Sequence, residues 1–369
     1  MKIGFDAKRA FLNASGLGNY SRNTLNALLK YSPDNNYILF TPKINKELFL
    51  HYNQFDVISP DSPVSKLFKS LWRSFLVSGQ LHKHKLDLFH GLSNELPDGV
   101  HKSSVPAVVT IHDLIFMRFP QFYKPIDRKI YSRKVKYACL AAKKIIAISE
   151  QTKHDLIKYF NVDSEKIEVI YQSISPHFFE RRDTEYLVEK YDLPKKYILS
   201  VGTLEHRKNQ LSLLKAVHSA KISVPVVFVG KPTLYSSGLL KFITENGMES
   251  QVNFLNSIPA KDLAALYQQA ELSVYISLFE GFGLPVIESM ASGCPVITSN
   301  VSCLPETAGG AAVLCDPENN NEIGIQIKKV LEDHSFRKKI TDKGTERAKL
   351  FHPEKYAQNL ISLYTKISS

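Results

Sequence analysis

The chain has 369 residues, which exceeds one typical hydrophobic core and is enough for two domains. Its hydrophobic content of 44% and charged content of 22% are those of an ordinary globular protein. The formal net charge of +11 predicts attraction to an anion, and nucleic acid, an acidic lipid surface and a nucleotide diphosphate all qualify. Because the sequence contains no RRM, KH, zinc-finger or basic-zipper signature, nucleic acid is not the expected partner.

The N-terminus and the cysteines indicate a compartment. The sequence begins MKIGFD, without the apolar stretch of a signal peptide, and no run approaches the roughly 18 apolar residues of a spanning helix. The four cysteines form no Cys-x-x-Cys pair, which predicts reduced thiols with no disulfide and no zinc site. We therefore expect a soluble, cytoplasmic protein.

The first half of the chain alternates strands with helices, which predicts a parallel sheet. The first strand ends at Asp6, and a helix is expected from Tyr20 onward, after Gly16 and Gly18. We place this first α/β domain at residues 1–185. Its predicted strands are residues 2–6, 37–40, 86–89, 107–111 and 145–147.

The glycine segment before the first long helix does not form a dinucleotide fingerprint. Gly16 and Gly18 lie too far beyond Asp6, and the third glycine is missing. Two interpretations remain open. The segment is either a flexible loop that closes over a diphosphate or acceptor, with Arg22 as an anion contact, or a plain surface turn.

Residues 66–76, KLFKSLWRSFL, predict an amphipathic helix. Its apolar residues share one face, while Lys66, Lys69 and Arg73 lie near the other. The place of this segment between two core strands favours a helix packed on the first sheet. The alternative is peripheral contact with an anionic membrane at its cytoplasmic face.

A second series of strands predicts a second domain at residues 186–352, after a charged linker at about 177–195. Doubly wound sheets bind ligands at the carboxyl ends of their strands, so ligands are expected in a central cleft that the two sheets face. Residues 353–369 form an amphipathic helix that either returns to the first domain or caps its own. The strands of this series are residues 197–202, 226–230, 252–255 and 272–276.

The sequence EGFGLPVIE at residues 280–288 joins a buried strand to a helix through a glycine loop. The unpaired N–H groups and dipole of a helix start attract a diphosphate, and Gly281 and Gly283 permit close approach. Glu280 at the loop mouth and Glu288 two turns on can each accept hydrogen bonds from sugar hydroxyls. The alternative is a helix cap at Glu280 and a solvated Glu288.

Two cations follow the strand at 197–202, within the loop TLEHRKN. Arg207 can form bidentate hydrogen bonds with phosphate oxygens, and Lys208 can supply a point charge. Both are therefore placed to stabilise a leaving nucleoside diphosphate. The alternative is a solvated basic loop. Because the sequence contains no Asp-x-Asp triplet, we expect the transfer to need no metal and no other cofactor.

In the first domain, His112 and Asp113 follow the strand at 107–111 and are expected to face the cleft. Such a pair can act as an acid, a base or a hydrogen-bonding anchor, and the alternative is a histidine satisfied within a loop. In the second domain, Gly230 ends a strand and is expected to approach the nucleotide.

The Glu-x7-Glu motif of residues 280–288 and the following ASGCPVI resemble the retaining GT4 glycosyltransferases, over nearly the whole chain. The resemblance implies the GT-B fold, with two doubly wound Rossmann-like domains. It implies that Glu280 holds the donor sugar, that Glu288 holds the ribose, and that His112 contacts the transferred sugar. The backbone after Glu280, through Gly281, Phe282, Gly283 and Leu284, would hold the diphosphate.

The same resemblance adds an acceptor side and a reaction. His90 and Asn94, in another strand-end loop, join Asp113 on the acceptor side. Segments TIHDL and TLEHRKN are most like mannosyltransferases of surface polysaccharides, which implies transfer from GDP-mannose first and a UDP-sugar second, to a glycan or lipid-linked acceptor. Many relatives have arginine where this chain has Thr203, which leaves the division of labour between Arg207 and Lys208 open. The alternatives are a silent nucleotide-sugar-binding subunit and, more remotely, an RNA-binding protein.

Overall fold

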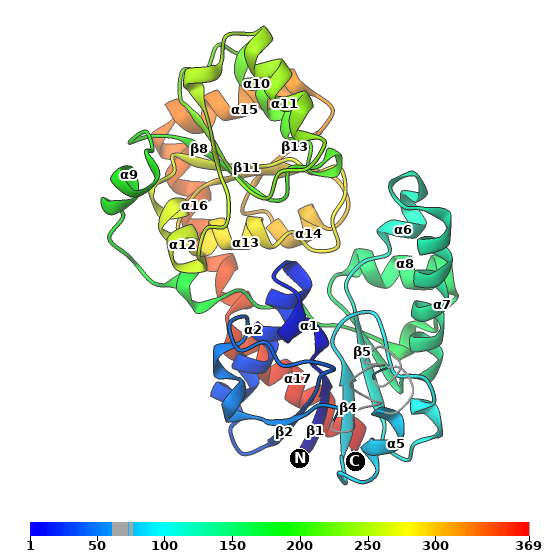
Figure 1. Cartoon of the computed structure of the whole chain (residues 1–369). Coiled ribbons are helices and arrows are strands. Elements are labelled where there is room, and N and C mark those ends of the chain that lie inside the picture. Colours follow the sequence, from blue (N-terminus) through cyan, green and yellow to red (C-terminus); the bar gives the residue numbers. More distant parts are fainter. Residues whose placement is uncertain (61–72, 74–76, 369) are drawn as a thin grey trace. The chain divides into compact units, whose positions relative to one another are not determined.

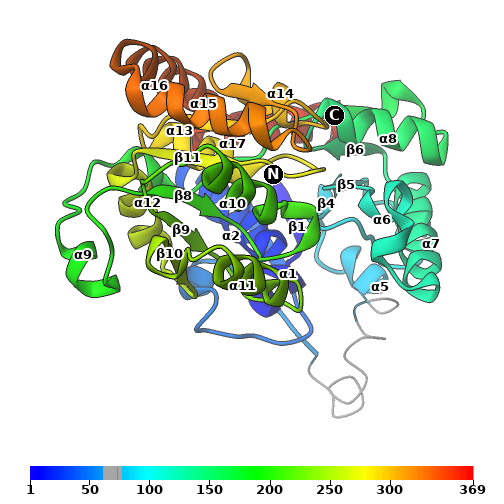
Figure 2. The same cartoon turned by 90° about the horizontal axis from the view of Figure 1, so that it is seen from above.

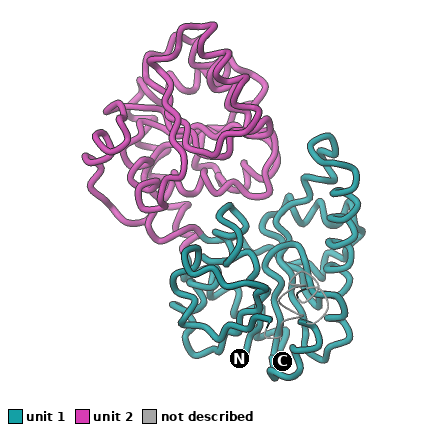
Figure 3. The backbone as a smooth tube through the Cα atoms, viewed as in Figure 1, with its two compact units in different colours: residues 1–173, 353–369 teal, residues 174–352 magenta. Residues whose placement is uncertain are grey.

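The chain divides into two compact units. The computed structural model describes residues 1–60, 73 and 77–368. Unit 1 comprises Met1–Ser173 and Pro353–Ser369, and unit 2 comprises Ile174–His352 (Figure 3). The predicted amphipathic segment 66–76 lies outside the described residues, apart from Arg73.

The division between the units lies earlier in the chain than the boundary predicted after residue 185. The residues that follow it already pack on unit 2. The ring of Phe178 contacts that of Tyr267, with centroids 6.1 Å apart, and the Arg181 guanidinium donates to the Ser292 carbonyl over 3.2 Å. The segment 177–195 is therefore part of unit 2, and its prediction as a linker is wrong.

Unit 1 is built on a parallel sheet whose seven described strands run in the order β3-β2-β1-β4-β5-β6-β7. Alternate residues of a strand point to opposite faces, so the sheet supports two apolar layers. Ile3 and Phe5 of β1 belong to the layer beneath α2 and α17, whereas Val109 and Ile111 of β5 belong to the layer beneath α7. Figures 1 and 2 show α2 and α7 on these opposite sides. The strands are β1 (Lys2–Asp6), β2 (Asn36–Phe40), β3 (Asp56–Ile58), β4 (Leu88–Gly91), β5 (Ala107–Ile111), β6 (Lys144–Ala147) and β7 (Ile167–Val169).

The helices of unit 1 connect these strands and cover both faces of the sheet. A typical one is α8. Ser149 caps its start, because the Ser149 side chain accepts the Thr152 N–H, and Asn161, with a φ of 50°, caps its end. The described helices are α1 (Lys8–Leu12), α2 (Gly16–Tyr31), η1 (Leu50–Gln54), α5 (Val77–Leu81), η3 (Val100–Lys102), α6 (Ile115–Arg118), η4 (Pro120–Phe122), α7 (Pro125–Ala141), α8 (Glu150–Phe160), η5 (Ser164–Lys166) and α17 (Pro353–Ser368).

The C-terminal helix α17 belongs to unit 1, although the chain reaches it only after unit 2. Its tyrosines join a buried network of hydroxyl groups. The Tyr356 hydroxyl lies 3.0 Å from Thr24 Oγ1 and 2.8 Å from the Tyr20 hydroxyl, both on α2. The Tyr364 hydroxyl lies 2.6 Å from His90 Nδ1. These bonds fix α17 in place as a layer of the unit 1 core.

Unit 2 contains a parallel sheet in the order β10-β9-β8-β11-β12-β13. Figure 1 shows α10, α11 and α15 over one face of it and α12, α13 and α14 over the other. The order reverses between β8 and β11, so the carboxyl ends of these two strands form the switch point where such sheets bind ligands. The strands are β8 (Ile198–Val201), β9 (Val226–Val229), β10 (Val252–Leu255), β11 (Leu272–Tyr275), β12 (Val296–Ser299) and β13 (Val313–Cys315).

The helices of unit 2 follow the same alternation. Asn319 and Asp333 cap α15 and α16, since each side chain accepts an N–H group from the first turn. No helix in the described ranges of either unit is long and apolar enough to cross a membrane. The described helices of unit 2 are η6 (Pro176–Phe179), α9 (Tyr186–Tyr191), η7 (His206–Lys208), α10 (Gln210–Ser219), α11 (Ser236–Glu245), η8 (Glu249–Gln251), α12 (Ala260–Gln269), α13 (Leu284–Ala291), α14 (Leu304–Ala308), α15 (Asn320–Glu332), α16 (His334–Ala348) and η9 (Lys349–Phe351).

Candidate active site

The cationic loop of unit 2 follows β8 and carries Arg207 and Lys208 in the short helix η7. The Arg207 guanidinium donates through Nη1 to the Phe279 carbonyl over 2.8 Å. In return, the Leu278 N–H donates to the Arg207 carbonyl over 2.9 Å. These bonds tie the loop to the segment that follows β11, which carries Glu280. The two strands at the switch point thus deliver their loops to one place.

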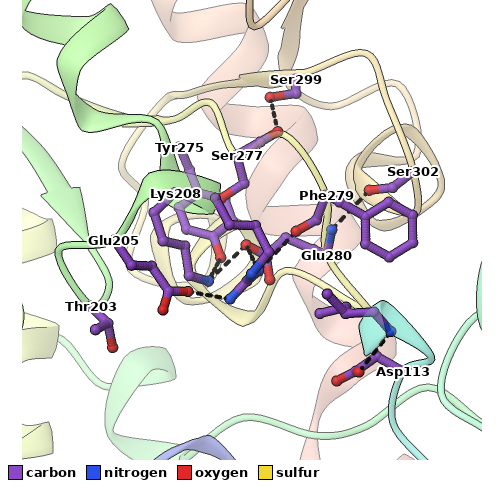
Figure 4. A network of polar contacts seen from close by, with 12 residues as sticks. Asp113, Thr203, Glu205, Lys208, Tyr275, Ser277, Phe279, Glu280, Ser299 and Ser302 are labelled. Atoms are coloured by element: carbon purple, nitrogen blue, oxygen red, sulfur yellow. Dashed lines mark hydrogen bonds and ion pairs between the residues drawn. The ribbon is translucent and has the colours of Figure 1, made fainter. Parts of the chain in front are cut away.

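One carboxylate oxygen, Glu280 Oε1, meets both cations (Figure 4). It lies 2.7 Å from Lys208 Nζ and 2.8 Å from Arg207 Nη1. The Lys208 ammonium also donates to the Tyr275 hydroxyl over 2.5 Å. The backbone N–H of Glu280 donates to Ser302 Oγ over 3.1 Å, which fixes the backbone at Glu280. The structure therefore brings together Glu280, Arg207 and Lys208, the predicted catalytic residues of this unit.

Burial and charge together set the protonation of this cluster. Burial alone would raise the pKa of Glu280, but Lys208 and Arg207 outweigh it and lower that pKa to about 2. Burial lowers the pKa of Lys208, and Glu280 partly offsets the shift. Glu205, whose Oε1 lies 2.5 Å from Arg207 Nη2, supplies a second negative charge. The cations are therefore held in position before any ligand arrives, as electrostatic stabilisation of a leaving group requires.

The glycine loop between β11 and α13 depends on a conformation that a side chain would disturb. Gly283 has a φ of 97°, and a Cβ there would lie 2.6 Å from Leu304 Cδ2. The Phe282 ring is buried against Phe351, with centroids 5.7 Å apart. The side chain of Phe282 therefore belongs to the core, so any contact of Gly281, Phe282 and Gly283 with a ligand involves backbone groups. Leu284 begins α13, whose dipole is positive at this end.

Glu288 lies on α13, about one turn beyond that helix start, and is half-buried. Burial raises the pKa of its carboxyl to about 7, and the nearby Tyr267 hydroxyl partly offsets the shift. Glu280 and Glu288 thus differ in protonation, because only Glu280 has cations beside it. Near neutral pH, Glu288 changes between a neutral and an ionised form.

The predicted donor residue Gly230 has a packing role. A Cβ on Gly230 would lie 1.9 Å from the carbonyl oxygen of Gly202, so only glycine lets the ends of β9 and β8 approach so closely. Gly202 itself has a φ of 148°. This contact shapes the loop that begins at Thr203, and it explains the glycine without a ligand.

In unit 1, His112 is buried and held by three groups. Its ring Nε2 lies 2.9 Å from the Leu92 carbonyl, and its backbone N–H donates to Asn94 Oδ1 over 2.7 Å. Because a carbonyl only accepts, Nε2 carries the proton and Nδ1 is left as the acceptor. The Tyr20 ring lies against the imidazole, with centroids 4.4 Å apart. Burial lowers the pKa of His112 to about 4, so the ring is neutral and suits a hydrogen-bonding anchor better than an acid.

The prediction of His90 on the acceptor side is not supported by its surroundings. The side chain is completely buried, and its two ring nitrogens meet the Tyr364 hydroxyl at 2.6 Å and Thr110 Oγ1 at 2.8 Å. Burial lowers the pKa of His90 to about 3, so it is neutral. His90 therefore holds α17 to the sheet and has no surface for an acceptor in this structure.

The prediction of a flexible glycine loop at Gly16 and Gly18 is wrong. Both residues lie in the first turn of α2, which begins at Gly16. A Cβ on Gly18 would lie 1.7 Å from the Asn13 carbonyl oxygen, so this glycine permits tight packing of the turn before the helix. Arg22 donates through Nη1 to the Asn13 carbonyl over 2.8 Å and the Ala10 carbonyl over 2.9 Å. The guanidinium therefore braces this turn.

Unit 1 has a pocket of about 210 Å³ at the carboxyl ends of β4 and β5. The predicted acceptor residues Asn94 and Asp113 both line it. Sequence reasoning missed most of the rest of its wall, because no motif marks those residues, which lie on α1, α6 and α7 and in the loop before α7. The main missed residues are Arg9, Phe116, Tyr123, Tyr131 and Lys134.

The described residues contain no group of three or more His, Cys, Asp or Glu side chains that could hold a metal ion.

In unit 2, the prediction also missed Tyr275 and Ser302. Tyr275 was included only as part of an apolar strand, although its hydroxyl contacts Lys208. The available signal was the position of Tyr275, which ends β11 shortly before the first glutamate of the Glu-x7-Glu motif.

A parallel sheet in each unit, with a cationic cluster at the switch point of the second, defines the class of GT-B glycosyltransferases. The comparisons with known proteins agree. The sucrose-phosphate synthase of Thermosynechococcus elongatus superposes with a TM-score of 0.80 at 21% identity, covering 100% of this chain and 99% of that one. HepE of Anabaena, in complex with UDP, gives a TM-score of 0.79 at 19% identity, covering 99% and 100%. At these identities the likeness concerns the fold alone.

Sequence comparison identifies the family. A model described as Glycosyltransferase Family 4 matches residues 14–178, and one described as Glycosyl transferases group 1 matches residues 183–347. O-antigen chain mannosyltransferase B of Escherichia coli is 32% identical over 77% of this chain and 75% of its own length. O-antigen chain mannosyltransferase RfbU of Salmonella typhimurium is 30% identical over 60% of each. The chain belongs to the GT4 glycosyltransferases, and mannosyltransferases are among its relatives.

Proposed function

We propose that the protein transfers mannose from GDP-mannose to a hydroxyl group of a saccharide acceptor, with retention of configuration, in the assembly of a surface polysaccharide. The observation that carries the proposal is the pair of buried cations, Arg207 and Lys208, held on one oxygen of Glu280. Mannose is favoured because the relatives named above are O-antigen mannosyltransferases. A UDP-sugar is the second candidate, since HepE was solved with UDP-glucose.

The donor would occupy the switch point of the unit 2 sheet. Its diphosphate would accept hydrogen bonds from Arg207, Lys208 and the N–H groups at the start of α13, which together stabilise the charge that develops as GDP leaves. Glu280 would turn one carboxylate oxygen to the sugar hydroxyls while the other stays with the cations. Glu288 would accept from the ribose hydroxyls.

The acceptor would lie in unit 1. Asn94 and Asp113 line its pocket, and both can accept hydrogen bonds from saccharide hydroxyls. The aromatic rings of Phe116, Tyr123 and Tyr131 supply flat apolar surface in the same wall, which suits the faces of a sugar ring. His112 would present Nδ1 to the transferred sugar. In a front-face reaction a leaving phosphate oxygen takes the acceptor proton, so neutral His112 need not act as a base.

Because cationic side chains and the α13 helix start neutralise the diphosphate in this proposal, transfer should need no metal. We expect purified protein to convert GDP-mannose and the probe acceptor octyl α-mannoside to GDP and an α-linked disaccharide at the same rate in EDTA and in magnesium. Product chromatography with NMR of the new anomeric centre measures both rate and configuration. A Glu280→Gln variant is the control for contaminating activity. Restoration of an EDTA-silenced reaction by magnesium or manganese, or a β-linked product, would contradict the proposal.

A further inference from the structure

The outer face of helix α7 combines apolar and cationic side chains. Six exposed residues at helical spacings of three and four fall within one stripe of α7. The opposite stripe contains Val135, Ala138 and Cys139, which are buried against the sheet of unit 1. The rotation of the helix is therefore fixed, and the residues of the opposite, outer stripe are exposed in this structure. We call it the α7 face; it comprises Ile126, Lys129, Ile130, Arg133, Lys136 and Leu140.

The three apolar residues of the α7 face are largely open to solvent. Ile126 is 62% exposed, Ile130 43% and Leu140 72%. Single exposed apolar residues are common on proteins, but three on one stripe of one helix form an apolar strip, in which cations separate Leu140 from Ile126 and Ile130. Such a strip loses contact with water only when another body covers it.

The cations of the α7 face are exposed and carry no counter-charge from the protein. Among the described residues, no carboxylate forms an ion pair with Lys129, Arg133 or Lys136. The only acidic residue of α7, Asp127, lies in the first turn and off this face. Lys129, Arg133 and Lys136 lie between the apolar side chains along the helix. Their long flexible stems let the charged ends stay in water while the apolar side chains contact an apolar partner.

We infer that the α7 face docks on the surface of an anionic lipid bilayer. Isoleucine and leucine side chains at this spacing would enter the boundary between headgroups and acyl chains, and the interleaved cations would pair with lipid phosphates. The net charge of +11 adds long-range attraction to such a surface. This inference does not depend on the proposed transfer reaction, because it concerns binding to lipid without donor or acceptor.

A second copy of the chain fits this face poorly. A two-fold symmetric contact would bring Lys129, Arg133 and Lys136 against a face that carries the same three cations and no acidic residue to separate them. Nucleic acid would satisfy the cations but would leave Ile126, Ile130 and Leu140 without a partner. Of these three occupants, only an anionic bilayer offers both negative charge and an apolar layer at the right depth.

Flotation of the full chain with vesicles tests the inference. The protein is expected to float with equimolar phosphatidylglycerol and phosphatidylcholine vesicles in 0.1 M salt, but not with pure phosphatidylcholine. In 1 M salt, where the screening length falls from about 10 Å to about 3 Å, binding should weaken strongly. Each cation near an anionic surface changes partitioning about fivefold, so the loss of three attractions alone weakens binding about 100-fold. The triple variant Lys129→Glu, Arg133→Glu, Lys136→Glu also adds three repulsions, so it should bind more than about 100-fold more weakly.

The chain offers matched controls for both kinds of side chain. The reversal of three exposed lysines of unit 2, Lys328→Glu, Lys339→Glu and Lys343→Glu, also takes the net charge from +11 to +5, because each reversal changes it by two. The apolar variant Ile126→Ser, Ile130→Ser, Leu140→Ser is matched by Leu234→Ser, Leu240→Ser, Ile325→Ser, which removes side chains at least 54% exposed elsewhere. Circular dichroism and Tm verify that each variant folds.

The inference requires both α7 variants to lose binding while both control variants keep it. Equal losses in the α7 and control charge variants would show attraction by net charge alone and would overturn the docking face. Wild-type protein that stays unbound to anionic vesicles would overturn it as well. So would a dimer, detected by light scattering, that dissociates in the apolar α7 variant, because a second copy would then cover the face.

Discussion

Replacing Lys208 with methionine will lower kcat/KM for the nucleotide-sugar donor by about 10²- to 10³-fold, the usual cost of losing one preorganised charge partner of a developing anion. Methionine fills the space of the lysine stem but carries no charge. Glu280 keeps Arg207 as a partner at 2.8 Å, so the variant should remain folded. Steady-state kinetics of GDP release measure the effect, and a Tm close to that of the wild type shows that folding is intact.

A matched variant separates the charge from its surroundings. Tyr275→Phe removes the hydroxyl that accepts from Lys208 at 2.5 Å but leaves the ammonium on Glu280, so we expect a loss of less than about tenfold. If Lys208→Met retained activity within threefold of the wild type, the cation would have no part in stabilising the leaving group. The role would then fall to Arg207 and the α13 helix start.

Replacing Arg73 with methionine will destabilise the protein by about 3–5 kcal/mol, because it leaves the buried Asp6 carboxylate without its cation and Glu95 with only the half-exposed Lys134. The Arg73 guanidinium donates through Nε to Asp6 Oδ2 over 2.8 Å, and its Nη1 lies 2.6 Å from Glu95 Oε2. All three side chains are largely buried. Chemical denaturation measures the loss. Lys134→Met is the control, since Lys134 reaches Glu95 at 3.2 Å from a half-exposed position and should cost at most about 1 kcal/mol.

The pH dependence of stability gives this prediction a second measurement. Burial opposes the shift, but Arg73 and Lys134 lower the pKa of Glu95 to about 2, below its value in the unfolded chain. The folded state then binds fewer protons than the unfolded state, so this contribution is complete above about pH 4.5 and is lost as the pH falls toward 2. Arg73→Met should flatten the acid limb of the stability curve. An unchanged limb together with a loss below 1 kcal/mol would contradict the role of Arg73.

The sequence pattern predicted the alternating architecture because each unit repeats strand and helix with clear apolar runs. The predicted strands 2–6, 107–111 and 252–255 match β1, β5 and β10. The pattern missed β3, β7 and β13, which have three residues each and carry partly exposed side chains at sheet edges. It also missed β12, a buried four-residue strand whose first two residues were used only as part of the ASGCPVI motif. So short a run carries too little periodicity to be recognised.

The candidate site was predictable where one local segment carries the chemistry. The motif from Glu280 to Glu288 and the Arg207-Lys208 pair each lie within a single loop and helix start, so spacing identified them. His90 was misjudged because the residue that buries it, Tyr364, comes 274 positions later in the chain. The unit 1 pocket was missed for a similar reason, since Tyr131 and Lys134 lie on a helix that only tertiary packing brings to Asn94. Contacts distant in sequence leave no local pattern.

Thermal stabilisation by nucleotides in EDTA tests the central claim, a nucleotide-sugar site in unit 2, most directly. A ligand at 100 times its Kd adds about 2.7 kcal/mol to stability, so GDP should raise the Tm by several degrees, more than UDP or ADP. The shift should vanish in Glu288→Ala. It should also be smaller at pH 6 than at pH 8, because the Glu288 pKa of about 7 leaves a protonated carboxyl at the lower pH. The absence of any shift with all three nucleotides at pH 8, or equal shifts in wild type and Glu288→Ala, would contradict the assignment.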